Sequence, residues 1–354
     1  MMDYPRRRHS LQELLAPPNL EALLVTKPVN VRYLTGFTGE GLLLLGPEPV
    51  LCTDRRYEVD AHEQAVGCRV ICTDRSHLSS LVEATAASSY TRLGFEPDAL
   101  TWTQHEFLTK GLPGAELVSA PQLVEGLRAR KDAAEVALIE RACGIADRAL
   151  AHLIAALAPG RTEKELSWEF TAAILAAGAE DVSFPLIIAS GPQAALPHAT
   201  VTGRPLQVGD MVVMDVGVKV EGYCSDITRT VPVGAPTDEF VTRYQAVRAA
   251  QQAGIAALAV GCPAAEVDHA ARQVLEEAGL GEAFAHSLGH GVGLEIHEGP
   301  SVSRLSPARL EPGNVVTIEP GVYFPGWGGI RLEELLVLEK SGPRQLTAAP
   351  LWEP

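Results

Sequence analysis

Residues 209–217 read Gly-Asp-Met-Val-Val-Met-Asp-Val-Gly, and residues 313–321 read Gly-Asn-Val-Val-Thr-Ile-Glu-Pro-Gly. The two stretches match without a gap at an offset of 104 residues. Each is an apolar run of the length of a buried strand that carries one carboxylate, Asp215 in the first and Glu319 in the second. The match predicts two related halves that present a carboxylate at the same place on a strand.

A second pair of segments supports this duplication. Residues 154–160 (Ile-Ala-Ala-Leu-Ala-Pro-Gly) match residues 255–261 (Ile-Ala-Ala-Leu-Ala-Val-Gly) at an offset of 101 residues. Each is followed by a helical pattern that ends in Ala-Gly, at Gly178 and at Gly279. Two ungapped matches in the same order favour duplication over chance similarity among Ala-rich helices and Val-rich strands. We therefore predict a duplicated α+β unit with a pseudo-twofold axis.

The remainder of the chain indicates a further domain. Its 354 residues exceed the roughly 250–300 at which a single core stops growing. Short apolar runs alternate with helical segments from about residue 20 to about residue 120, which is typical of an α/β domain. A long helical pattern begins at Lys131. We predict an α/β N-terminal domain at residues 1–125 and the duplicated α+β domain at residues 126–354.

Composition excludes several classes of function. The chain has 29 Lys and Arg against 44 Asp and Glu, a net charge of −15, which is opposite to that of a phosphate-backbone binder, so we expect no nucleic-acid partner. No apolar stretch approaches the roughly 20 residues of a membrane helix, and none follows the basic N-terminus as in a signal peptide. The six cysteines form no Cys-x-x-Cys pair. We expect reduced thiols, no membrane association and a cytoplasmic location.

The acidic excess includes two pairs of carboxylates that we expect to face each other. Asp215 and Asp226 are nearly equidistant from a predicted turn at Gly222, and Glu319 and Glu333 are placed in the same way in the second half. Directly opposed residues in a hairpin have Cβ atoms about 4.5–5.5 Å apart, where like charges are destabilising. Four such carboxylates in one cavity must hold protons or bind cations. Their apolar surroundings disfavour a solvated acidic face, so we predict cations.

Three histidines in a glycine-rich segment supply candidate nitrogen ligands: His286, His290 and His297. Oxygen-rich coordination with one imidazole suits Mn²⁺ best, with Co²⁺, Zn²⁺ or Fe²⁺ as alternatives. Two such ions about 3.5–4 Å apart generate a nucleophilic hydroxide at neutral pH and stabilise an oxyanion, which indicates a hydrolase. A His-Glu-x-x-His zinc motif fails because position 301 is Ser, and the glycines of the segment lack the spacing of a dinucleotide-binding loop.

With these features the chain resembles the creatinase/aminopeptidase P/prolidase superfamily, whose catalytic domain has the duplicated pita-bread fold. The resemblance covers nearly the whole chain, including residues 30–38 and 127–132. It also includes five metal-ligand segments: Met214-Asp-Val-Gly217, Ser225-Asp-Ile-Thr-Arg-Thr230, Gly289-His-Gly-Val-Gly-Leu294, Thr317-Ile-Glu-Pro-Gly321 and Ile330-Arg-Leu-Glu333.

The resemblance implies a role for each of these metal-ligand segments. It implies that Asp215 chelates one ion, that Asp226 and Glu333 bridge two divalent ions, and that His290 and Glu319 complete one coordination sphere each. Manganese is the favoured metal.

The resemblance also implies how the reaction is catalysed. Glu319 would move protons between the attacking water and the departing proline nitrogen. His297 would stabilise the oxyanion, His198 and His286 would orient substrate, and Arg331 matches an arginine that supports the metal ligands.

The implied reaction is hydrolysis before proline, and the substrate length is a separate question. Asp54, Arg56 and Tyr57 form an Asp-x-Arg-Tyr motif that resembles one in small aminopeptidases P and predicts substrate binding; strand-end ion pairing is the alternative. Ser301 stands where some dipeptide-specific relatives carry arginine. We predict an Xaa-Pro aminopeptidase acting on proline-containing peptides, with an Xaa-Pro dipeptidase (prolidase) as the alternative. A methionine aminopeptidase and an inactive interaction module are less favoured, and we expect a homodimer.

Overall fold

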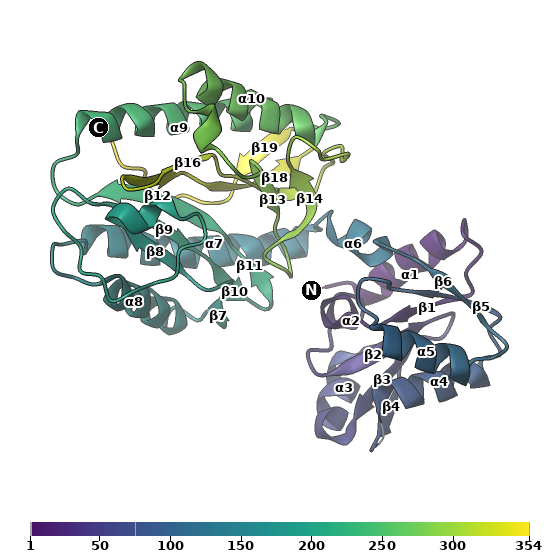
Figure 1. Ribbon diagram of the computed structural model, residues 1–354. Helices are drawn as coiled ribbons and strands as arrows, with labels where there is room; N and C mark the ends of the chain where they lie inside the picture. Colours follow the sequence, from purple (N-terminus) through teal and green to yellow (C-terminus); the bar gives the residue numbers. More distant parts are fainter. Residues whose placement is uncertain (1, 75, 354) are drawn as a thin grey trace. The chain divides into compact units, whose positions relative to one another are not determined.

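The computed structural model describes residues 2–74 and 76–353, which form two compact units, residues 1–128 and 129–354 (Figure 1). Each unit is described by itself. The predicted combination of an α/β N-terminal domain with a duplicated α+β domain is confirmed. Among the described residues, no helix combines the length and the apolar composition needed to cross a bilayer.

The first unit is built around a six-stranded mixed sheet of order β4-β3-β2-β1-β5-β6. Its strands are β1 (Ala22–Val25), β2 (Gly41–Leu45), β3 (Val50–Asp54), β4 (Arg69–Thr73), β5 (Arg92–Phe95) and β6 (Glu116–Ser119). Its helices are α1 (Tyr4–Leu15), α2 (Pro28–Thr35), the 3₁₀ turn η1 (Arg55–Tyr57), α3 (Glu58–Gln64), α4 (His77–Ala87), α5 (Trp102–Gly111) and α6 (Leu123–Arg128). Strand β1 is central and buried on both faces, which explains its unbroken apolar run. Strand β4 is an edge strand that pairs in parallel with β3.

The second unit consists of two halves, each of which begins with two helices and continues with a series of strands. The first half contains α7 (Ala133–Ala155), α8 (Glu163–Ala176), β7 (Asp181–Val182), β8 (Ile187–Ser190), η2 (Gly191–Ala195), β9 (Met211–Val216), β10 (Val218–Val220), β11 (Tyr223–Cys224) and β12 (Ile227–Pro232). The second half contains α9 (Asp238–Ala257), α10 (Ala264–Glu277), η3 (Gly281–Ala283), β13 (Gly289–Gly291), β14 (Glu298–Val302), β15 (Val315–Ile318), β16 (Gly321–Phe324), β17 (Gly328–Arg331), β18 (Glu334–Glu339) and β19 (Gly342–Gln345). Helices α8 and α10 begin and end at the predicted offset of 101 residues, which agrees with duplication.

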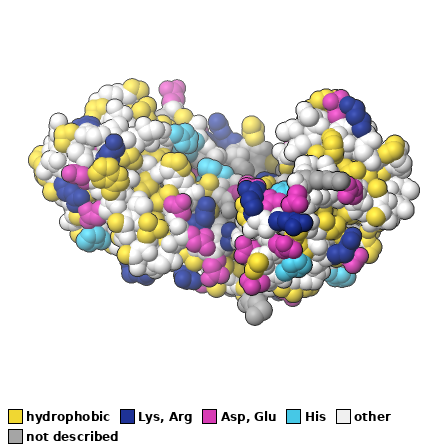
Figure 2. All heavy atoms as spheres, turned by 90° about the horizontal axis from the view of Figure 1, so that it is seen from below, with side chains coloured by type: hydrophobic (Ala, Val, Ile, Leu, Met, Phe, Trp, Pro, Cys, Tyr) yellow, Lys and Arg dark blue, Asp and Glu magenta, His cyan; other side chains and the backbone are white. Residues whose placement is uncertain are grey.

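The helices of each half cover one side of the strands. In Figure 1, α9 and α10 lie along one face and α7 and α8 along the other. Apolar side chains of α7 and α8 pack on β8, β9 and β12, and those of α9 and α10 pack chiefly on β15 and β18. Fully burying one Leu or Ile contributes roughly 1.5–3 kcal/mol, so both layers hold the strand ends between them firmly in place. In Figure 2, acidic and basic side chains are interspersed on the face in view.

Strand register corrects one expectation from the sequence. Strands β9 and β12 pair so that Asp215 lies opposite Thr228, and Asp226 comes just before β12, so these two carboxylates are diagonal neighbours. In the second half the pairs Ile318 with Glu334 and Gly321 with Arg331 share one register, and that register places Glu319 opposite Glu333, as expected.

Candidate active site

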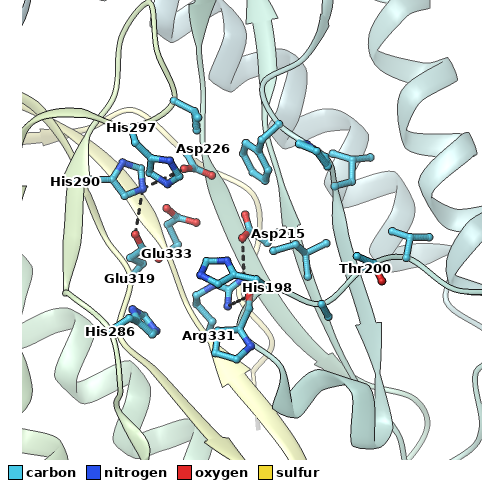
Figure 3. A pocket seen from close by; sticks show the side chains of 18 of the residues that line it. His198, Thr200, Asp215, Asp226, His286, His290, His297, Glu319, Arg331 and Glu333 are labelled. Atoms are coloured by element: carbon cyan, nitrogen blue, oxygen red, sulfur yellow. Dashed lines mark hydrogen bonds and ion pairs between the residues drawn. The ribbon is translucent and has the colours of Figure 1, made fainter. Parts of the chain in front are cut away.

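A cavity of about 680 Å³ in the second unit collects nine of the predicted site residues. They are the five predicted metal ligands Asp215, Asp226, His290, Glu319 and Glu333, the three histidines His198, His286 and His297, and Arg331. Figure 3 shows their side chains turned toward a common centre from both halves of the duplicated unit. The fold therefore brings together residues that lie as far apart in the sequence as His198 and Glu333.

Each predicted metal ligand lies in a strand or directly beside one. Asp215 lies in β9, Asp226 directly precedes β12, His290 is the centre of β13, Glu319 follows β15 and Glu333 lies between β17 and β18.

The glycines around His290 permit close strand packing and do not form a phosphate loop. A Cβ at Gly289 would lie 2.0 Å from the carbonyl oxygen of Thr317, and one at Gly291 would lie 2.2 Å from that of Gly299. Any side chain at either position would push His290 away from the carboxylates.

Asp226, His290 and Glu333 each supply one ligand atom, and these three atoms lie within 4.8 Å of one another. His290 Nε2 is 3.2 Å from Glu319 Oε1 and 3.6 Å from Asp226 Oδ2, so one imidazole contacts two of the carboxylates (Figure 3). The Thr228 hydroxyl donates to Glu333 Oε2 at 2.7 Å. This spacing is short enough for the group to share bound cations.

Three buried carboxylate oxygens have no hydrogen-bond partner among the described residues: Asp215 Oδ1, Asp226 Oδ1 and Glu333 Oε1. Burial, and then neighbouring carboxylates, raise the pKa of Asp226 and of Glu333 well above the ordinary value. Leaving buried acceptors unmatched costs several kcal/mol, and a divalent cation would satisfy them. The oxygen-rich donor set with one imidazole therefore fits a pair of divalent ions.

Glu319 is electrostatically different from the other carboxylates. Burial by itself would raise its pKa, but the hydrogen bond and charge of His290 outweigh burial and lower that pKa to about 2. The same contact raises the pKa of His290, although burial opposes this. His290 and Glu319 thus form an ion pair, and Thr317 Oγ1 donates to Glu319 Oε1 at 3.1 Å.

Arg331 connects the carboxylates to the histidine side of the cavity. Its guanidinium donates to Asp215 Oδ2 at 2.6 Å, to the Tyr323 hydroxyl at 2.7 Å and to Thr228 Oγ1 at 3.2 Å. The Tyr323 hydroxyl in turn lies 3.0 Å from His286 Nε2. The sequence prediction missed Tyr323 and Thr228, because a hydroxyl on a strand has no distinguishing pattern, although both lie in or beside the quoted strand segments.

His297 and His198 lie at the exposed side of the cavity. The ring of His297 packs edge-on against His290, with centroids 4.3 Å apart. Burial, and then the neighbouring His290, lower the pKa of His297, which favours its neutral form.

Glu163, which the sequence prediction also missed, accepts hydrogen bonds from both ends of the loop that carries His198. Glu163 is fully buried in the first turn of α8. One of its oxygens accepts from Ser190 N at 2.9 Å and Ser190 Oγ at 2.6 Å. The other accepts from Thr202 N at 2.9 Å and Thr202 Oγ1 at 2.6 Å. One carboxylate therefore closes the segment from Ser190 to Thr202 that holds His198.

The Asp-x-Arg-Tyr motif lies in the first unit, where it forms local ion pairs. Asp54 accepts from the backbone and side chain of Arg56, with a shortest distance of 2.7 Å to Arg56 Nη2, and Arg56 also reaches Glu40 at 3.1 Å. These contacts hold the pKa of Asp54 well below its usual range. The ring of Tyr57 meets Phe37 edge-on. The predicted role of these residues in substrate binding stays a prediction.

Comparison with known proteins gives two family matches that together span most of the chain. Residues 7–130 match the Creatinase/Prolidase N-terminal domain, and residues 137–340 match Metallopeptidase family M24. The uncharacterized peptidase YqhT of Bacillus subtilis is 39% identical over 346 residues, which cover 96% of this chain and 97% of that protein.

Two solved structures share the fold across nearly their whole length. The Xaa-Pro dipeptidase from Bacillus anthracis superposes with a TM-score of 0.96 at 35% identity and covers 99% of both chains. The X-Pro aminopeptidase from Thermotoga maritima superposes with a TM-score of 0.88 at 32% identity and covers 94% of this chain and 97% of its own.

Proposed function

The chain belongs to metallopeptidase family M24, and from that membership we propose that it is an Xaa-Pro aminopeptidase, which hydrolyses the bond between an N-terminal residue and a following proline. One observation carries the hydrolytic part of this proposal. Three buried carboxylate oxygens without partners face the same cavity as His198, His286 and His297.

Asp215, Asp226, His290, Glu319 and Glu333 would hold two divalent ions, for which we propose Mn²⁺. Such ions lower the pKa of water and withdraw charge from a carbonyl oxygen. The protein contributes the orientation of the ligands, through the hydrogen bonds from Arg331 to Asp215 and from Thr228 to Glu333.

Glu319 is placed to move the proton. Its carboxylate lies on the cavity wall among the other predicted ligands, where it can accept a proton from water and return that proton to the leaving nitrogen. The nitrogen of an Xaa-Pro bond is a tertiary amide, so it must gain a proton before it leaves as proline.

The histidines would bind and orient the substrate. His297 is neutral and beside His290, which suits donation of a hydrogen bond to the carbonyl oxygen as charge develops there. His286 is fixed by Tyr323, and His198 lies on the loop that Glu163 closes. Apolar residues also line the cavity, including Phe184 and Ile187, which suits a proline ring.

Substrate length is the finer part of the proposal. Among the described residues that line the cavity, Arg331 is the one Lys or Arg, and it is already bound to Asp215 and Tyr323. The cavity therefore offers no spare cation for the carboxylate of a dipeptide, which favours longer peptides. The Bacillus anthracis relative is named a dipeptidase, and this name supports an Xaa-Pro dipeptidase as the second candidate. A homodimer and a cytoplasmic location stay predictions.

A comparison of rates on two peptides tests the assignment. We expect the Mn²⁺-loaded chain to cleave Arg-Pro-Pro with a higher kcat/KM than Gly-Pro. Cleavage of Gly-Pro alone would refute the aminopeptidase and support the dipeptidase. Asp215→Ala is the control, since it removes a predicted metal ligand and the partner of Arg331 and should abolish both activities together with metal binding.

A further inference from the structure

A second group of metal-ligand side chains lies in the first unit, outside the cavity described above. It consists of Glu58, His62 and Cys72, whose ligand atoms all lie within 4.8 Å of one another. We propose that these three residues form a binding site for one Zn²⁺ ion, distinct from the M24 centre.

The local fold brings the three side chains together for simple reasons. Glu58 and His62 are four residues apart on α3, so they lie one above the other on one face of the helix. Cys72 lies on the edge strand β4, in register with Thr53 of β3, and α3 packs against both strands. The ligands thus come from α3 and β4, and a bound ion would link the helix to this edge strand of the sheet.

The three side chains are available to a ligand. In the part of the chain that the structure describes, none of these three side chains makes a hydrogen bond or an ion pair. Glu58 and His62 are exposed and Cys72 is half-buried, so an ion can enter from solvent. Nearby Asp54 differs, because Arg56 and His77 already contact its carboxylate.

The donor set selects the metal. One thiolate, one imidazole and one carboxylate are the ligands that Zn²⁺ takes in tetrahedral sites, with the fourth position left for water. A thiolate disfavours Mn²⁺ and Mg²⁺, which prefer oxygen. Burial, and then the charge of Glu58, raise the pKa of the Cys72 thiol, so zinc would displace a proton when it binds.

Cys68 provides an internal comparison. It precedes β4 by one residue and is also half-buried, but it belongs to no group of three ligands among the described residues. A thiol beside this edge strand is therefore not sufficient, and the site is defined by Glu58 and His62 on α3 together with Cys72.

Titration of the metal-free full-length chain with Co²⁺, which replaces Zn²⁺ in such sites, separates this site from the M24 centre. No cysteine is among the described residues that line the catalytic cavity, so a thiolate-to-cobalt charge-transfer band in the near ultraviolet reports on a thiol outside that cavity. We expect the band to reach full intensity when one Co²⁺ ion is bound at this site, in addition to any at the M24 centre, and Zn²⁺ to remove it by displacement.

Three variants test whether Cys72 and His62 bind the Co²⁺ ion. Cys72→Ser should abolish the band, Cys68→Ser should keep it, and His62→Gln should weaken Co²⁺ affinity by at least the roughly 10–100-fold that loss of an outer metal partner costs. If circular dichroism shows that Cys72→Ser does not fold, His62→Gln carries the same test. No charge-transfer band in the wild-type chain at saturating Co²⁺, an unchanged band in Cys72→Ser, or an unchanged Co²⁺ affinity in His62→Gln would overturn the proposal.

Discussion

Replacing Glu163 by Gln tests whether one buried carboxylate positions His198. Each oxygen of Glu163 accepts two hydrogen bonds, from Ser190 at one end of the loop and from Thr202 at the other. Glutamine can accept from one end only, because its NH₂ group would face a backbone N–H at the other end. Its hydrogen bonds are also no longer charge-assisted.

The four hydrogen bonds to Glu163 indicate how much stability the substitution should remove. Hydrogen bonds to a charged group contribute about 1.5–3 kcal/mol each and neutral ones about 1 kcal/mol, while a stranded N–H costs about 1–3 kcal/mol. We expect the free energy of unfolding to fall by about 2–4 kcal/mol. A loop end that moves by about 1 Å can reduce catalysis by up to about 100-fold, so we expect kcat/KM to fall by about ten- to a hundredfold with metal content unchanged.

Urea unfolding, metal analysis and hydrolysis of Arg-Pro-Pro measure these effects. Glu165→Gln is the matched control: it lies two residues away on the same helix, is exposed, and accepts from Thr162 N at 2.8 Å in a capping box that Gln also supports. The double variant Glu163→Gln, His198→Ala should be no slower than His198→Ala alone. Full activity in Glu163→Gln, or independent losses in the double variant, would refute the reasoning.

Three further predictions concern the metal centre and the thiols. Removing metal with a chelator should lower the free energy of unfolding by about 2.7 kcal/mol for each ion lost, relative to a solution that holds metal at 100 times its Kd. Thermal unfolding measures this loss, and Mn²⁺ should restore activity better than Zn²⁺. Arg331→Met should lower the free energy of unfolding of the metal-free chain by about 3–5 kcal/mol, because it leaves Asp215 buried without its ion-pair partner. Arg344→Met is the control: Arg344 lies in an exposed cluster, so its replacement should lower the same quantity by less than about 1 kcal/mol in urea unfolding. Burial raises the pKa of Cys52 to about 12, so a thiol reagent at pH 8 should leave Cys52 unmodified in the native chain. The partly exposed Cys262 should be modified under the same conditions, and mass spectrometry distinguishes the two.

The sequence predicted the duplicated fold and the gathering of the carboxylates, because both depend on patterns that repeat along the chain. It misplaced one register. The hairpin turn consists of Glu221 and Gly222, both with positive φ, so its centre lies one residue later than expected. That shift moves the residue opposite Asp215 by two positions, from Asp226 to Thr228.

The groups that the sequence did not reveal act through contacts between different elements of the fold. Thr228 assists Arg331 across the two halves, whereas Tyr323 contacts Arg331 within the second half. Glu163 closes the loop of His198 within the first half. A single hydroxyl or carboxylate in an apolar element has no periodic signature. Its role depends on which strand end arrives beside it, which only the assembled fold determines.

The division of the predicted ligands between two halves has a consequence for biosynthesis. Asp215 and Asp226 are made early, but Glu319 and Glu333 follow about a hundred residues later, near the end of the chain. At about 5–20 residues per second, a growing chain spends several seconds with the first pair synthesised and the second pair absent. During that time the chain lacks at least two of the five predicted metal ligands, so we expect unfinished copies to have no peptidase activity. Chains that terminate before Glu333 should likewise be inert.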